Sequence, residues 1–177
     1  SLAIFEKVFG PEQGIVAKIL NNLASLFVNQ GRYSEAEPLF KRSLVIREKV
    51  SGPEHPSVGK ILNNLAYLYE YQGRYSEVEP LYQRSFTIFE KAFGPEHPYV
   101  ALSLNNLALL YANQGRYAEA EPLYKRSHTI FEKAFGPEHP SVAMSLNNQA
   151  YLYNYQGRFE EALVASRSGT DIYLRRF

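Results

Sequence analysis

The dipeptide Gly-Pro returns every 42 residues, at Gly10-Pro11, Gly52-Pro53, Gly94-Pro95 and Gly136-Pro137. The intervening sequence keeps the same register, and residues 52–93 and 94–135 are identical at 31 of 42 positions. A unit of this size cannot bury its apolar residues alone, so neighbouring units have to stack and share a continuous core. The repeat therefore predicts an array of stacked units.

Each unit carries two apolar stripes with helical spacing. In the second unit, the first stripe follows Pro56 and the second follows Gly73, a residue type that commonly ends a helix. The first stripe is Leu62, Leu65, Ala66 and Tyr69, and the second is Val78, Leu81, Tyr82, Ser85, Ile88 and Phe89. The prolines of the "GPEHP" segment disfavour helix there and make it a connector. The unit is thus a helix hairpin, and the predicted fold class is an all-α solenoid.

A proline lies near the start of each of the first three second helices, at Pro38, Pro80 and Pro122. Ser34 and Glu37 have the spacing of a capping box, in which serine caps the helix and glutamate reaches back to it. This spacing would place the proline in the first turn or just beyond, where its missing N–H costs least. We therefore expect a late helix start or a slight kink.

The repeat limits follow from the register. Residues 1–10 are expected to end the second helix of a preceding repeat, and repeats 1 to 4 to span 11–52, 53–94, 95–136 and 137–177 of a single solenoid. Repeat 4 departs from the pattern at Gln149, Leu163 and Gly169, so it is expected to be a terminal element or to pack more loosely. The absence of an initiating methionine suggests an excised piece of a longer protein.

Small and aromatic residues such as Ala66, Tyr69, Tyr82 and Ser85 occupy fixed places in units marked by "GPEHP", "LNNLA" and "QGRYSEAEPLY". This pattern resembles the tetratricopeptide repeat, and its 42-residue period resembles the kinesin light chain type of that repeat. The resemblance implies a right-handed superhelix whose concave groove, lined mainly by first helices, holds peptide segments of partner proteins. For kinesin light chains it implies acidic peptides with an aromatic anchor.

Each first helix carries a further stripe of residues on another face. At ~100° per residue, this stripe lies about 200° around the helix from its apolar core stripe. Several of the 11 differences between residues 52–93 and 94–135 fall on it, among them Lys60/Leu102 and Tyr67/Leu109. A variable face on a repeated frame suits partner discrimination, although solvent exposure alone would also permit it. The candidate groove residues are Lys18, Asn22, Asn29, Lys60, Asn64, Tyr67, Tyr71, Asn106, Asn113, Asn148, Tyr151, Asn154 and Tyr155.

Each first helix also carries an asparagine pair, which in the second unit is Asn63 and Asn64. An asparagine side chain both donates and accepts, so a row of them can hold the backbone of an extended peptide. The same groups can instead join neighbouring hairpins, since asparagine is a poor helix former. The second asparagine of each pair is expected to face the groove, and the first is left open between the two roles.

The stripe of candidate groove residues on the first helices carries few charged residues, and its charge changes along the chain. Lys18 and Lys60 can attract carboxylates or be solvated surface groups, and Leu102 and Met144 take their place in later units. The tyrosines suit interfaces. This gradient fits a partner segment with an acidic part and an apolar anchor, and the resemblance to kinesin light chains implies an aromatic anchor.

Composition narrows the remaining possibilities. The formal net charge is +1, which favours neither nucleic acid nor an anionic membrane, and the chain has no cysteine. No apolar run approaches the ~18 residues of a membrane span, and a cytoplasmic location is the default expectation. His55, His97 and His139 are too far apart for a compact metal motif and are expected to cap helices or lie in connectors. No catalytic, metal-binding or cofactor-binding constellation is found, so we do not expect an enzyme.

The sequence therefore favours a protein- or peptide-binding adaptor or scaffold. Two alternatives remain. One is a structural array that self-associates end to end, for which Phe5, Phe9, Ile172 and Tyr173 are the residues to replace. The other is a regulatory array within a larger signalling protein.

Overall fold

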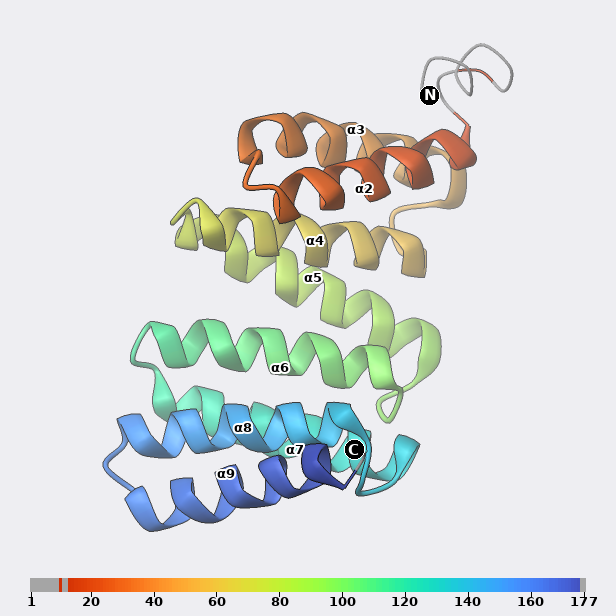
Figure 1. Cartoon of the computed structure of the whole chain (residues 1–177). Helices are drawn as coiled ribbons and strands as arrows, with labels where there is room; N and C mark the ends of the chain where they lie inside the picture. Colours follow the sequence, from red (N-terminus) through yellow and green to blue (C-terminus); the bar gives the residue numbers. More distant parts are fainter. Residues whose placement is uncertain (1–9, 11–12, 176–177) are drawn as a thin grey trace. The chain divides into compact units, whose positions relative to one another are not determined.

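The computed structural model describes residue 10 and residues 13–175, and all regular elements among them are α-helices (Figure 1). These are α2 (Gly14–Asn29), α3 (Tyr33–Ser51), α4 (Pro56–Tyr71), α5 (Tyr75–Phe93), α6 (Pro98–Asn113), α7 (Tyr117–Phe135), α8 (Pro140–Tyr155) and α9 (Phe159–Leu174). The all-α repeat fold is confirmed. The helix expected within residues 1–10 lies outside the described residues. Among the helices of residues 13–175, none combines the length and apolar character that crossing a bilayer requires.

The chain divides into two compact units, residues 1–92 and 93–177. In unit 1, α2 packs against α3, and α3 packs against α4. In unit 2, the successive helices α6, α7, α8 and α9 pack against one another in the same way. Figure 1 shows each first helix followed by a second helix that folds back beside it. A residue of unit 1 and the residue 84 positions later in unit 2 therefore hold equivalent places in the repeat register.

The predicted core stripe of α4 is buried. Leu62 and Ala66 are fully inaccessible, and Leu65 and Tyr69 are each 3% exposed. The second-helix stripe is buried as well, apart from Leu81, which is partly exposed and packs against Val58, Leu62 and Ile88. The apolar periodicity of the sequence thus identified the residues that hold the hairpins together.

A buried serine joins the two helices of each of the first three hairpins. Its hydroxyl donates to a backbone carbonyl of the first helix at 2.7–2.8 Å. The pairs are Ser43 with Ala17, Ser85 with Gly59, and Ser127 with Ala101. A small residue is required here because the second helix passes close to the backbone of the first.

The predicted serine cap and late start of the second helix were wrong for α3. Helix α3 begins at Tyr33 with Arg32 as its N-cap residue, and no side chain caps it. Pro38 therefore lies in the second turn, inside the helix. The Arg32 carbonyl accepts from the backbone N–H groups of Glu35 and Ala36, and the Arg32 side chain binds Glu35 through Nε and Nη2. The proline ring is on the exposed side of the helix.

The histidines of the connectors cap the helices that follow them, as predicted. His55 precedes α4, and its Nδ1 accepts from the backbone N–H of Ser57 at 3.2 Å. His97 and His139 cap α6 and α8 in the same way. Since proline occupies the first helical position, the histidine satisfies the next free N–H group.

An arginine in the turn of the hairpin joins consecutive repeats. Arg74 binds Glu77 through Nε and Nη2, and its Nη1 donates to Glu37 of the preceding repeat at 2.9 Å. The guanidinium also lies 3.8 Å from the ring centre of Tyr69. Burial disfavours a charge on Glu37, but hydrogen bonds from Lys41, Arg74 and Tyr69 outweigh it and lower the pKa of Glu37 to about 2. In unit 2, Arg158 makes the equivalent contacts with Glu161, Glu121 and Tyr153.

Repeat 4 diverges where the sequence predicted it, but its packing is close at one point. Gly169 takes the place of the serine, and a Cβ added there would lie 2.5 Å from Asn147 Oδ1 and 3.1 Å from the Ala143 carbonyl oxygen. Helix α9 thus approaches α8 closely at this glycine. Gln149 is 8% exposed, and its Nε2 is buried without a hydrogen-bond partner among the described residues.

One polar pair in unit 2 replaces apolar residues of unit 1. His128 on α7 and Ser145 on α8 are 2.9 Å apart, whereas Leu44 and Ile61 stand at the equivalent places in unit 1. The Ser145 hydroxyl donates to the Val142 carbonyl at 2.7 Å, so Nδ1 of His128 has to donate to Ser145. Burial lowers the pKa of His128, and the nearby Glu132 only partly opposes this effect.

We expect this histidine to make the stability of the protein depend on pH. Its pKa is lower in the folded chain than in the unfolded chain, so the unfolded chain binds more protons near and below pH ~6.5. The free energy of unfolding should therefore decrease as the pH falls through this range. His128→Leu, which installs the unit 1 residue, should reduce that decrease in urea titrations between pH 7.5 and 5.5. An unchanged pH dependence in this variant would contradict the assignment.

Candidate functional site

The candidate groove residues all lie on first helices and are accessible. Asn64, Asn106 and Asn148 are partly exposed, and the other ten are exposed. They divide between the units: Lys18, Asn22, Asn29, Lys60, Asn64, Tyr67 and Tyr71 are on α2 and α4 of unit 1, and Asn106, Asn113, Asn148, Tyr151, Asn154 and Tyr155 are on α6 and α8 of unit 2. Their exposure agrees with a binding face, but their role stays a prediction.

Two hollows with shared walls bring several of these residues together in unit 1. The first, of about 160 Å³, is lined by Ser25, Val28, Asn29, Phe40, Asn64 and Tyr67. The second, of about 320 Å³, is lined by Val28, Asn29, Gly31, Tyr33, Tyr67 and Tyr71. Since Val28, Asn29 and Tyr67 belong to both, the hollows form one continuous depression where α2 and α4 end.

Three tyrosines form the aromatic wall of this depression. The rings of Tyr33 and Tyr71 stack with centres 5.5 Å apart, and Tyr67 meets Tyr71 edge-on at 4.8 Å. The hydroxyls of Tyr67 and Tyr71 are hydrogen-bonded at 2.7 Å. This bond, together with burial, raises the pKa of Tyr67 to about 12.

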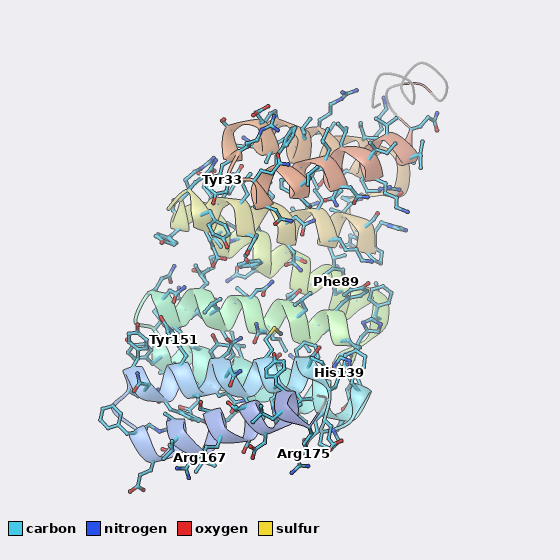
Figure 2. The ribbon with its side chains drawn as sticks, in the orientation of Figure 1. Tyr33, Phe89, His139, Tyr151, Arg167 and Arg175 are labelled. Carbon is cyan, nitrogen blue, oxygen red and sulfur yellow. The ribbon has the colours of Figure 1, made fainter. Side chains whose placement is uncertain are left out.

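Unit 2 repeats the aromatic wall. Tyr151 and Tyr155 have ring centres 4.5 Å apart and hydroxyls 3.1 Å apart, and Tyr117 lies 6.3 Å from Tyr155. The hydrogen bond to Tyr155 is the main cause of the raised pKa of Tyr151. Figure 2 labels Tyr33 and Tyr151, one member of the wall in each unit.

Tyr33 and Tyr117 were not predicted as groove residues, because both belong to the repeated "QGRY" turn and open a second helix. They reach the face of the first helices because the turn places the start of one helix beside the end of the next first helix. The recurrence of an aromatic residue at this turn position, also seen as Phe159, was the available signal.

Asparagines of the pairs form hydrogen bonds between consecutive repeats, and the second asparagine of a pair takes part as well as the first. Nδ2 of Asn64 donates to Oδ1 of Asn21 in the preceding repeat at 3.0 Å, and Nδ2 of Asn148 donates to Oδ1 of Asn105 at 2.8 Å. In both junctions the second asparagine of one repeat therefore binds the first asparagine of the repeat before it. Asn105 is 4% exposed, which favours the structural role for a first asparagine.

A third hollow, of about 260 Å³, lies between α2, α3 and α4. It contains the predicted residues Lys18, Asn22 and Lys60. It also contains Arg47, which was not among the predicted residues. The available signal was that Phe89 and Phe131 occupy the equivalent place in repeats 2 and 3.

The tetratricopeptide repeat family model matches residues 1–49, 15–91, 60–121 and 99–175. The chain belongs to the tetratricopeptide repeat family. Tetratricopeptide repeats generally mediate protein–protein interactions, and their fold is typically a binding scaffold without enzymatic activity. No curated protein matches the sequence.

Solved structures specify the type of repeat. A candidate kinesin light chain of Podosopora anserina with nearly identical TPR-like repeats is 27% identical, with a TM-score of 0.77 over 99% of this chain and 83% of that chain. The kinesin light chain type of repeat, inferred above from the period, is confirmed.

Two further structures share the fold at lower identity. BtubC (BKLC) from P. vanneervenii is 23% identical, with a TM-score of 0.83 over 93% of this chain and 66% of that chain. Aspartyl phosphate phosphatase F from Bacillus subtilis is 14% identical, with a TM-score of 0.78 over 90% of this chain and 40% of that chain. The chain thus spans just under two thirds of BtubC and less than half of the phosphatase.

Proposed function

We propose that this protein is an adaptor or scaffold that binds peptide segments of partner proteins on the faces of its first helices, with one such face in each unit. The observation that carries the proposal is the continuous depression at the ends of α2 and α4. Its lining combines aromatic rings with side-chain amides, as peptide-binding surfaces do.

The tyrosines supply binding energy at a low cost in conformational entropy. Tyr67 and Tyr71 are 47% and 53% exposed, so a ligand would remove a large apolar area from water. Their rings and hydroxyls already hold each other in place, and preorganised side chains lose little freedom when a ligand binds. An apolar or aromatic side chain of the partner is the expected occupant.

The amides can hold the main chain of the ligand. Asn22 and Asn29 are exposed on the same helix face, two turns apart, and each carries a donor and an acceptor. Such groups bind the backbone of an extended peptide whatever its side chains. Asn64 contributes less than the sequence suggested, because its Nδ2 is engaged with Asn21.

A double variant, compared with a control variant, tests this function. Once a peptide array probed with the full chain has identified a ligand, Tyr67→Ala with Tyr71→Ala should weaken binding by at least about tenfold, measured by fluorescence anisotropy. The thermal midpoint should change little, since both side chains are exposed.

Val45 provides a control away from the first helices. It lies on α3 of the same unit, is 63% exposed and lines none of the three hollows. Val45→Ala should leave binding unchanged. Equal binding by the Val45 variant and the double variant would rule out the depression as the binding site.

Self-association is the second candidate function, and helix α9 favours it. Phe159, Leu163, Val164 and Leu174 are each more than half exposed on this helix. Exposed apolar residues of this number on one helix are typical of an interface. Tyr173, one of the residues selected from the sequence, is 40% exposed, whereas Phe5 and Phe9 lie outside the described residues. Either function is compatible with a regulatory array in a larger signalling protein.

Light scattering distinguishes this candidate from peptide binding. If α9 mediates self-association, the apparent mass should increase with protein concentration, and Val164→Lys should abolish the increase. A constant monomer mass for the unmodified chain would exclude this candidate.

A further inference from the structure

Repeat 1 departs from the repeat pattern at two positions that meet in space. Arg47 stands where repeats 2 and 3 have Phe89 and Phe131, and Gly14 stands where later repeats have proline. Nη2 of Arg47 donates to the Gly14 carbonyl at 2.6 Å. A Cβ added to Gly14 would lie 3.0 Å from Nη1 of Arg47, so the glycine leaves room for the guanidinium.

The guanidinium of Arg47 is held in place by its bond to Gly14, but its hydrogen-bonding capacity is not fully satisfied by the described residues. Its Nε is buried and has no hydrogen-bond partner among the described residues. A buried N–H without an acceptor is destabilising, so an acceptor bound here would recover stabilisation. Arg47 lines the 260 Å³ hollow between α2, α3 and α4.

Two further cations line the same hollow. Lys18 on α2 and Lys60 on α4 flank it, and the remaining walls come from Asn21, Asn22, Ser57, Ala17 and Ile61. Among the described residues that line it, none carries a carboxylate. Three positive charges and several neutral donors therefore surround one small open space, which is a favourable environment for an anion.

The equivalent place in unit 2 has no charge. Leu102, Phe131 and Met144 stand where unit 1 has Lys18, Arg47 and Lys60. The repeat fold thus forms with apolar residues at all three positions. The cations are a property of this one junction, and the packing of the fold does not require them.

We infer that this hollow is a subsite for a phosphate group carried by a phosphorylated side chain of the peptide ligand. A phosphate monoester has a charge of about −1.5 to −2 at neutral pH and three acceptor oxygens, which matches three cations better than the single charge of a carboxylate does. The inference rests on the proposed function, because the phosphate belongs to the peptide that the tyrosines anchor.

The distance between the two sites sets a register for that peptide. Lys60 and Tyr67 are seven residues apart on α4, which corresponds to about 10 Å along the helix. An extended peptide advances about 3.3 Å per residue. A peptide that runs extended along α4 would therefore place its aromatic or apolar anchor about three residues from the phosphorylated residue.

Binding of matched peptides tests the subsite. The probes are fluorescein-labelled peptides with phosphoserine, serine or glutamate at one position and tyrosine three residues away on either side, in an alanine–glycine background. The full chain should bind a phosphoserine peptide at least about tenfold more tightly than the serine and glutamate peptides. Equal affinities for the phosphoserine and glutamate peptides would overturn the phosphate assignment.

The repeat itself supplies the variants. Arg47→Phe installs the residue of repeat 3, where Phe131 is buried and the first helix carries Ala101 at the place of Ala17. The variant should fold, and it should lose the preference for phosphoserine. Lys91→Leu removes one charge from an exposed pair with Glu54 elsewhere in unit 1 and should keep the preference. Equal losses in both variants would indicate a general charge effect and overturn the inference.

Inorganic phosphate separates this inference from the proposed function. Phosphate added at constant ionic strength should shift the ¹H–¹⁵N NMR signal of Arg47 Nε–H in the full chain, whether or not any peptide binds. Failure of all peptides together with a phosphate-dependent shift would reject peptide binding and keep the anion site. Peptide binding that depends on Tyr67 and Tyr71 but not on phosphorylation would reject the subsite alone.

Discussion

Replacing Leu62 with alanine is expected to lower the free energy of unfolding by about 2–5 kcal/mol. Leu62 is fully buried, and it packs in a cluster with Val58 and Ile88 that Leu44 and Leu81 extend. The truncation removes apolar contact and leaves a cavity that neighbours on three helices cannot fill. Urea denaturation followed by far-UV circular dichroism measures the loss.

Leu26→Ala is the control for this prediction. Leu26 lies on α2 of the same unit and is 50% exposed, so its truncation should cost no more than about 0.5 kcal/mol. Comparable losses in the two variants would mean that the cluster around Leu62 does not hold unit 1 together.

Ser127→Leu is expected to destabilise unit 2 by about 1–3 kcal/mol or more. Ser127 is fully buried, and its hydroxyl donates to the Ala101 carbonyl at 2.7 Å. A leucine would lose this bond and would have to separate α6 from α7. The urea midpoint should fall clearly.

Two further variants separate the causes. Ser127→Ala loses only the hydrogen bond and should cost about 1 kcal/mol, whereas Ser166→Leu places the same leucine at an exposed position of α9 and should cost little. If Ser127→Leu is no worse than Ser127→Ala, the close approach of the two helices is not what selects the small residue.

Much of the fold could be predicted because packing and repetition act on the same residues. Leu62, Leu65, Ala66 and Tyr69 are buried as their spacing requires, and the 42-residue period identified the family. The histidine caps were also predictable, because proline directly after His55 leaves one N–H group within its reach. Pro38 was harder, since α3 begins at Tyr33 without the side-chain cap that the Ser34–Glu37 spacing predicted.

The binding face was predicted only in part, because its walls come from different repeats. Tyr67 and Tyr71 were selected from one helix, but Tyr33 joins them from the turn of the preceding hairpin. The hydrogen bonds between asparagines of consecutive repeats depend on how two first helices align, and the sequence of one helix does not reveal this alignment. Arg47 was overlooked because a departure from the repeat gains meaning only when its neighbours in space are known.

The contact between a turn arginine and a glutamate of the preceding repeat bears on how such a chain can change in length. All four repeats have a turn arginine at the place of Arg74, and the first three have a glutamate at the place of Glu37, which Leu163 replaces in repeat 4. Within each unit, the arginine of the later repeat binds the glutamate of the earlier one. Each of the first three 42-residue blocks therefore carries both residue types that form this contact. Duplication or loss of one of these three blocks would keep an arginine and a glutamate available for this contact, so it would not require a compensating mutation at either position.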